Sequence, residues 1–169
     1  FSVMNVNARS ILPKSDDLEG LLLAYNPDVT VISETWLHDN ISDEDIVPIS
    51  HEIVRRDRGA RGGGVAVVLK KSIEHTVIPH NTNVEMLWIL VSLCQYNVLI
   101  GALYRPPEAD LSVLEALHDF MHEHCKHNAN IILCGDFNLP KINWDLLNAS
   151  SSCQHSELML DIAFLFRLK

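Results

Sequence analysis

The sequence predicts a layered α/β sandwich, in which sheets of β-strands are covered by helices. Apolar runs rich in β-branched residues recur along the chain, and segments with leucines at helical spacing lie between them. Two of the apolar runs, 84–93 and 97–104, are separated by a short polar link that is typical of a hairpin. Strands joined partly by helices and partly by hairpins favour a layered sandwich over a purely parallel sheet.

The N-terminal part is predicted to form a strand–helix–strand unit. A short strand over 2–7 precedes a helix over 18–25, with Asp16 or Asp17 as its N-cap. The β-branched run 29–33 is the next strand, and Glu34 follows it directly. An acidic surface loop is predicted over 38–50, followed by strands over 53–56, 65–69, 84–93 and 97–104. The last part is predicted to form a helix over 110–127 capped by Asp110, a strand over 130–134 and a helix over 157–168.

Composition and size indicate one globular domain over 1–169. The chain is 47% apolar and 21% charged, which is ordinary for a folded protein. Both ends, Phe1 and Lys169, lie inside apolar segments, so we expect the domain to continue beyond Lys169 and the chain to be truncated at its N-terminus as well. No apolar run approaches the roughly 20 residues that span a bilayer, and we expect no membrane partner.

The net charge limits the possible functions, and the cysteines indicate the cellular setting. A net charge of −9 argues against a passive nucleic-acid-binding surface, but not against an enzyme that handles phosphodiesters through a metal ion. The four cysteines have no paired spacing, which favours free thiols in a reducing, intracellular setting.

Polar side chains stand where several predicted strands end. Asn5 lies in the first strand, Glu34 follows the second, and Asp136 and Asn138 follow the strand over 130–134. If these strands are neighbours in one sheet, the four side chains line a single pocket at its edge. Such oxygen donors suit Mg²⁺, which can bind a phosphate oxygen and help to generate hydroxide. Alternatively, each residue only satisfies local backbone groups at a strand end.

Two further features could contact phosphate. Tyr104 supplies a phenol at the end of another predicted strand. Arg58 and Arg61 lie in an arginine-rich segment with the glycines of 62–64, which is either a phosphate-contacting loop or a solvated turn.

The motifs together resemble the endonuclease/exonuclease/phosphatase superfamily, and within it the apurinic-type endonuclease domain of LINE-like, non-LTR retrotransposons. The resemblance covers nearly the whole chain. It is carried by the segments Asn5–Ser10, Ser33–Leu37, Asp57–Val65, Leu103–Pro107 and Gly135–Asn138.

The resemblance implies metal-assisted hydrolysis of a DNA phosphodiester. Glu34 would be the principal ligand of Mg²⁺, with Mn²⁺ as the alternative ion, and Asn5 would assist it. Asp136 would orient or deprotonate the attacking water, Asn138 would position the phosphate, and Tyr104 would stabilise its charge. Further DNA or phosphate contacts are expected from Asn7, Arg9, Arg58, Arg61 and Arg105.

The resemblance also implies the setting of the domain. The partners would be DNA and a reverse transcriptase domain in the same polyprotein, and we expect a monomer. A nuclear location follows from this role alone.

One departure from the family pattern matters. The family completes its site with a later Ser-Asp-His motif, and this triplet occurs nowhere in 1–169. General acid–base help is typically worth about 10²–10⁴-fold, so we expect little nuclease activity from the chain alone. Missing strands would also leave an apolar sheet face and edge uncovered, so we expect low stability. The alternatives are an inactive remnant or interaction module of the same fold, and a phosphatase of the same superfamily.

Overall fold

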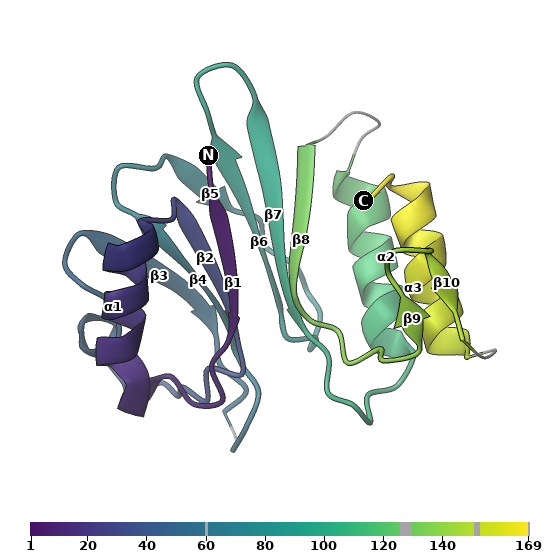
Figure 1. Cartoon of the computed structure of the whole chain (residues 1–169), viewed down its shortest axis with the longest axis horizontal. Coiled ribbons are helices and arrows are strands. Elements are labelled where there is room, and N and C mark those ends of the chain that lie inside the picture. The colour runs from purple at the N-terminus through teal and green to yellow at the C-terminus, as the bar shows by residue number, and fades with distance from the viewer. Residues whose placement is uncertain (60, 126–129, 151–152, 169) are drawn as a thin grey trace.

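The computed structural model describes residues 1–59, 61–125, 130–150 and 153–168. Two β-sheets pack face to face, one helix covers the outer face of the first sheet, and two helices cover the outer face of the second (Figure 1). The predicted layered α/β sandwich is therefore confirmed.

The first sheet has the strand order β1-β2-β4-β3. β1 pairs in parallel with β2, whereas β4 is antiparallel to both β2 and β3. Its strands are β1 (Val3–Asn7), β2 (Val29–Ser33), β3 (His51–Arg56) and β4 (Val65–Lys70).

The second sheet has the order β5-β6-β7-β8. β6 and β7 form the predicted antiparallel hairpin, and β7 pairs in parallel with β8. Its strands are β5 (His75–Val77), β6 (Met86–Ser92), β7 (Asn97–Tyr104) and β8 (Asn130–Asp136), and a separate small ladder joins β9 (Ile142–Asn143) to β10 (Asn148–Ala149).

The helices are α1 (Ser15–Tyr25), α2 (Ser112–His124) and α3 (Gln154–Leu165), with 3₁₀ turns η1 (Leu12–Lys14) and η2 (Asp43–Asp45). The predicted side-chain caps were wrong, because the N-cap residues of α1 and α2 are Lys14 and Leu111 and neither makes a capping hydrogen bond. Residues 126 and 127 of the predicted helix over 110–127 lie outside the described residues. Within the described ranges, no helix is long and apolar enough to cross a membrane.

Side chains that alternate between the two faces of the strands divide the core into three apolar clusters, and two of these lie on opposite faces of β7. In β7, Ile100 and Ala102 face the first sheet, whereas Leu99 and Leu103 face α2 and α3. A period of two is the expected behaviour of a strand that is buried on both faces. Tyr104 belongs to the set that faces the first sheet, so the sandwich directs its ring between the two sheets.

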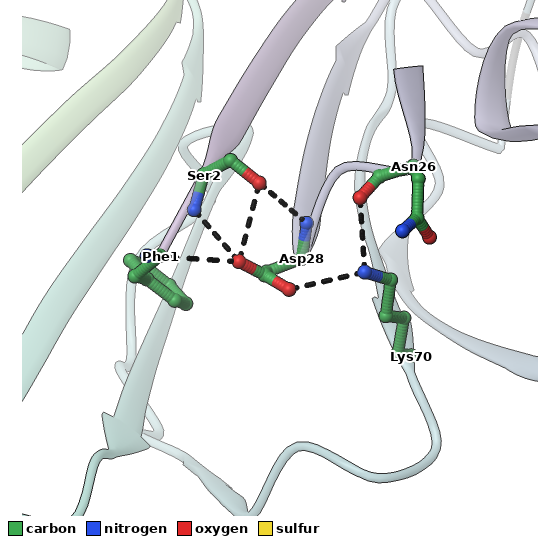
Figure 2. Close-up of polar contacts among 5 residues, drawn as sticks. All are labelled: Phe1, Ser2, Asn26, Asp28 and Lys70. Carbon is green, nitrogen blue, oxygen red and sulfur yellow. Dashed lines mark hydrogen bonds and ion pairs between the residues drawn. The ribbon is translucent and has the colours of Figure 1, made fainter. Parts of the chain in front are cut away.

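Asp28 joins the two neighbouring strands β1 and β2 to the end of β4, as Figure 2 shows. Its Oδ2 accepts hydrogen bonds from the backbone N–H of Ser2 at 2.8 Å and from the Ser2 hydroxyl at 3.2 Å. Its Oδ1 lies 3.1 Å from Nζ of Lys70, which also donates to the carbonyl of Asn26 at 2.9 Å. Burial alone would raise the pKa of Asp28, but the hydrogen bonds from Ser2 and Lys70 outweigh it and lower the pKa.

We expect Asp28→Asn to destabilise the protein by about 0.2–1 kcal/mol at neutral pH, the usual range for a partly exposed pair. A lowered folded-state pKa contributes stability that is present above the unfolded-state value, about pH 4, and is lost as the pH falls through the folded-state pKa. The stability difference between parent and variant should therefore shrink in acid. Urea unfolding at a series of pH values tests this, and a difference independent of pH would contradict it.

Candidate active site

Four strands deliver polar side chains to one end of the sandwich. Asn7 ends β1, Glu34 follows β2, Tyr104 ends β7 and Asp136 ends β8. Because β1 runs parallel to β2 and β7 runs parallel to β8, the carboxyl ends of each pair lie at the same edge of their sheet.

Asn7 connects the two edges. Its Nδ2 donates to Glu34 Oε1 at 2.9 Å and to Asp136 Oδ2 at 2.7 Å. The expectation that the pocket lies at the edge of one sheet was therefore wrong, because Glu34 and Asp136 come from different sheets. Asn5 lies two residues earlier on the same face of β1, and its Nδ2 is 3.4 Å from the carbonyl oxygen of Gly135.

Asn138 is joined to Asp136 and to the end of β7. Its backbone N–H donates to Asp136 Oδ1 at 3.1 Å, and its Nδ2 donates to the carbonyl of Arg105 at 2.8 Å. The backbone N–H of Arg105 in turn donates to the carbonyl of Asp136 at 2.9 Å. Asp136 thus has a hydrogen-bond donor on each carboxylate oxygen, which fixes the orientation of the group.

Arg105 does not lie where a DNA-contacting residue was expected. It is only 3% exposed, and its guanidinium donates to the carbonyls of Ala109 at 2.7 Å, Pro106 at 3.3 Å and Asn138 at 3.4 Å. Burial lowers the pKa of Arg105, which accords with a cation enclosed by loops. The structure therefore corrects the predicted phosphate contact: this side chain holds together the loops that carry Asn138.

The backbone is strained where the site residues stand. Glu34 has φ +54° and Asn138 has φ +48°, in the left-handed region that non-glycine residues seldom adopt. Ser10 donates its N–H to the carbonyl of Glu34 at 2.9 Å and helps to hold that conformation. Such strain persists only where the surrounding structure imposes it, and strained residues are frequent at functional sites.

Gly135 permits the approach of β8 to β7 just before Asp136. Its φ is +137°, and a Cβ at this position would collide with the carbonyl of Leu103 on the paired strand. Only glycine fits between these backbones, so the Gly-Asp pair of the motif has a steric reason as well as a chemical one.

Tyr104 is 7% exposed, and the carboxylates of Glu34, Glu85 and Asp136 all act on the pKa of its phenol. Burial raises its pKa, Glu34 raises it further, and Arg58 acts in the opposite direction. Tyr104 is therefore a protonated phenol at neutral pH and can donate a hydrogen bond.

Glu85 is a site residue that the sequence did not reveal. Its Oε1 lies 2.7 Å from Nε and 2.5 Å from Nη2 of Arg58, and its Oε2 accepts a hydrogen bond from the backbone N–H of Gly64. The Arg58 guanidinium carbon lies 5.5 Å from the centre of the Tyr104 ring. Glu85 lies near the start of the predicted strand over 84–93, one residue before β6, in no recognisable motif, and only the fold brings it to Arg58.

The other two arginines are exposed. Arg9 follows β1, and Arg61 lines a cavity of about 580 Å³ beside the Glu34 loop. The cavity is lined by Ser10, Trp36, His38, Asp39, Asn40, Gly59, Arg61 and Gly62. The predicted contacts of Arg9 and Arg61 with DNA stay predictions.

The donors at this end suit a hard cation. Among the described residues, no group of three or more His, Cys, Asp and Glu side chains could hold a metal ion. The site offers two carboxylates, Glu34 and Asp136, that approach the same amide nitrogen, together with the amide oxygens of Asn5 and Asn7. Mg²⁺ is typically bound by one or two carboxylates and keeps several waters, so this set fits it.

A layered α/β sandwich with carboxylates and amides at its strand ends suits metal-assisted hydrolysis. The model of the endonuclease/exonuclease/phosphatase family matches residues 4–152. The chain therefore belongs to this family.

Solved structures show the same fold. The endonuclease domain of TRAS1, a telomere-specific non-LTR retrotransposon, has a TM-score of 0.72 at 12% identity, over 98% of this chain and 70% of that one. An AP endonuclease from Archaeoglobus fulgidus has a TM-score of 0.70 at 16% identity, over 98% and 70%. The 3′ phosphatase NExo from Neisseria, solved with a product DNA hairpin, has a TM-score of 0.66 at 15% identity, over 97% and 70%. A comparison with curated protein sequences gives no match.

Proposed function

We propose that this chain hydrolyses DNA phosphodiesters with the help of a divalent metal ion, as the endonuclease domain of a LINE-like retrotransposon. The observation that carries the proposal is the pair of hydrogen bonds from Asn7 Nδ2 to Glu34 and Asp136. They bring the two carboxylates together at the end of the sandwich where Tyr104 and Asn138 also stand. The similarity to the TRAS1 endonuclease domain supports the retrotransposon setting, and the NExo structure with product DNA supports DNA as the substrate.

Glu34 would hold the metal ion, with Asn5 assisting and the amide oxygen of Asn7 as a further candidate donor. A bound Mg²⁺ supplies charge neutralisation at the phosphate and lowers the pKa of water. Asp136, held by Asn7 and by the N–H of Asn138, would orient the attacking water and accept its proton. Tyr104, as a protonated phenol, would donate a hydrogen bond to a phosphate oxygen.

The wider role follows from the same proposal. A nick in DNA would prime reverse transcription by a polymerase domain in the same polyprotein, and the domain would work in the nucleus as a monomer. Mg²⁺ is the ion proposed, with Mn²⁺ as a substitute of the same ligand preference.

We expect Glu34→Gln to weaken divalent-metal binding and to abolish metal-dependent nicking, because it replaces the anionic donor by a neutral amide of the same shape. Calorimetric titration with Mn²⁺ measures binding, and relaxation of supercoiled plasmid in Mg²⁺ measures nicking. Glu19→Gln is the matched control, since it removes the same charge from an exposed position of α1. Metal binding and nicking that survive in Glu34→Gln would refute the assignment.

A phosphatase is the second candidate, favoured by the fold shared with the Neisseria 3′ phosphatase. The two functions are separated by substrate. An endonuclease relaxes a closed plasmid, whereas a 3′ phosphatase leaves it intact and releases inorganic phosphate from a DNA end that carries a 3′ phosphate.

A further inference from the structure

Glu85 contacts three parts of the active-site end at once. Its backbone carbonyl accepts a hydrogen bond from the N–H of Tyr104 at 2.9 Å. Its carboxylate binds Nε and Nη2 of Arg58 on one oxygen and the N–H of Gly64 on the other. The side chain is 11% exposed, and a carboxylate removed from water to this extent needs such partners to compensate its lost hydration.

Gly63 makes room for this ion pair. Its φ is +69°, and a Cβ at this position would collide with the Arg58 guanidinium and with Glu85 Oε2. The close approach of the pair to the loop backbone therefore depends on the absence of a side chain at this position.

The same loop is bonded to the residues that follow Glu34. The backbone N–H of Thr35 donates to the carbonyl of Gly64 at 3.3 Å, and that of Trp36 donates to the carbonyl of Gly63 at 2.9 Å. Through the loop over 61–64, Glu85 is thus linked to the Glu34 segment of the first sheet, while its own backbone is bonded to Tyr104 in the second sheet.

We propose that Glu85 is a positioning residue for the reaction: it holds the Arg58 guanidinium against the Tyr104 ring and fixes the phenol relative to the Glu34 segment. Arg58 is thereby kept 5.5 Å from the ring centre, a distance at which a cation is attracted to an aromatic face. The guanidinium is engaged by Glu85 through Nε and Nη2, which leaves Nη1 outside the ion pair. The catalytic meaning of this arrangement rests on the proposed function, but the arrangement itself can be tested without it.

The direct test observes the tyrosine ring. The chain has three tyrosines, and Tyr25 and Tyr96 are 71% and 51% exposed, so both can be replaced by phenylalanine. In this background, tyrosine labelled with ¹³C in the ring gives NMR signals from Tyr104 alone. We expect Glu85→Gln and Arg58→Met each to shift these signals, and the double variant to shift them no further than the larger single change, because the two residues act as one unit.

A pair of glycine variants supplies the matched control. Gly59 has φ +71°, close to that of Gly63, but a Cβ there meets nothing within 4 Å among the residues that the structure describes. Gly59→Ala and Gly63→Ala therefore impose similar backbone strain, and only Gly63→Ala disturbs the ion pair. We expect the Tyr104 signals to move in Gly63→Ala and to stay in place in Gly59→Ala.

A measurement of nicking activity separates this inference from the proposed function. In the parent background, Glu85→Gln is expected to lower kcat for nicking by up to about 10²-fold with little change in KM, as misplacement of a reacting group can do. Unchanged Tyr104 signals in folded Glu85→Gln would overturn the positioning role, whatever the activity. Shifted Tyr104 signals in a chain that hydrolyses no DNA would support the positioning and count against the proposed function alone.

Discussion

Replacing Asp136 with asparagine is expected to slow metal-dependent DNA nicking by about 10²–10⁴-fold, the usual contribution of a general base. The carboxylate accepts hydrogen bonds from Asn7 Nδ2 at 2.7 Å and from the N–H of Asn138 at 3.1 Å, so its orientation is set before substrate arrives. An asparagine has the same shape but cannot accept a proton from water. Its NH₂ group would also oppose one of these two donors.

Supercoiled plasmid is the substrate of choice for this measurement. A single nick relaxes the whole molecule, so slow hydrolysis by a chain without the Ser-Asp-His motif remains measurable. Asp161→Asn serves as the control, since it removes the same charge from an exposed position of α3. A nicking rate in Asp136→Asn close to that of the parent would show that Asp136 does not activate the water.

Local pattern predicted the buried strands well. β2 and β7 have the bounds expected for 29–33 and 97–104, because each is an apolar run closed by polar or turn-forming residues. β5, β9 and β10 were missed, since they are two or three residues long and carry no alternation that distinguishes them from loops. The predicted helix over 157–168 begins earlier, at Gln154, because helix ends are weakly marked without a side-chain cap.

The candidate site was predicted in composition but not in arrangement. Asn5, Glu34, Tyr104, Asp136 and Asn138 all stand at the same end of the sandwich, as their places at strand ends indicated. The order of the strands in two separate sheets is a tertiary property, and it decides that Asn7 lies between the carboxylates. For Arg105 the sequence was misleading, because a charged residue beside a motif resembles a phosphate ligand until its 3% exposure is known.

Trp88→Ala is expected to destabilise the protein by about 3–5 kcal/mol, the range for removal of a large buried aromatic side chain. Trp88 is fully buried between the second sheet and α2, where it stacks on Phe120 with ring centres 4.5 Å apart. Gly101 on β7 leaves the space for the indole, since a Cβ there would lie 2.5 Å from the ring. An alanine would leave a cavity that these rigid neighbours cannot fill, and the loss would be a large part of a typical total stability.

Trp88→Phe distinguishes the contribution of the side-chain volume to stability from that of the indole N–H. The indole Nε1 is buried without a hydrogen-bond partner in the described part of the chain, so phenylalanine gives up no hydrogen bond and keeps much of the apolar volume. We therefore expect Trp88→Phe to cost much less than Trp88→Ala. Urea unfolding followed by circular dichroism measures both, independently of the fluorescence of Trp36 and Trp144. Equal losses in the two variants would mean that the indole makes a specific interaction, and a small loss in both would mean that the layer between the second sheet and α2 repacks freely.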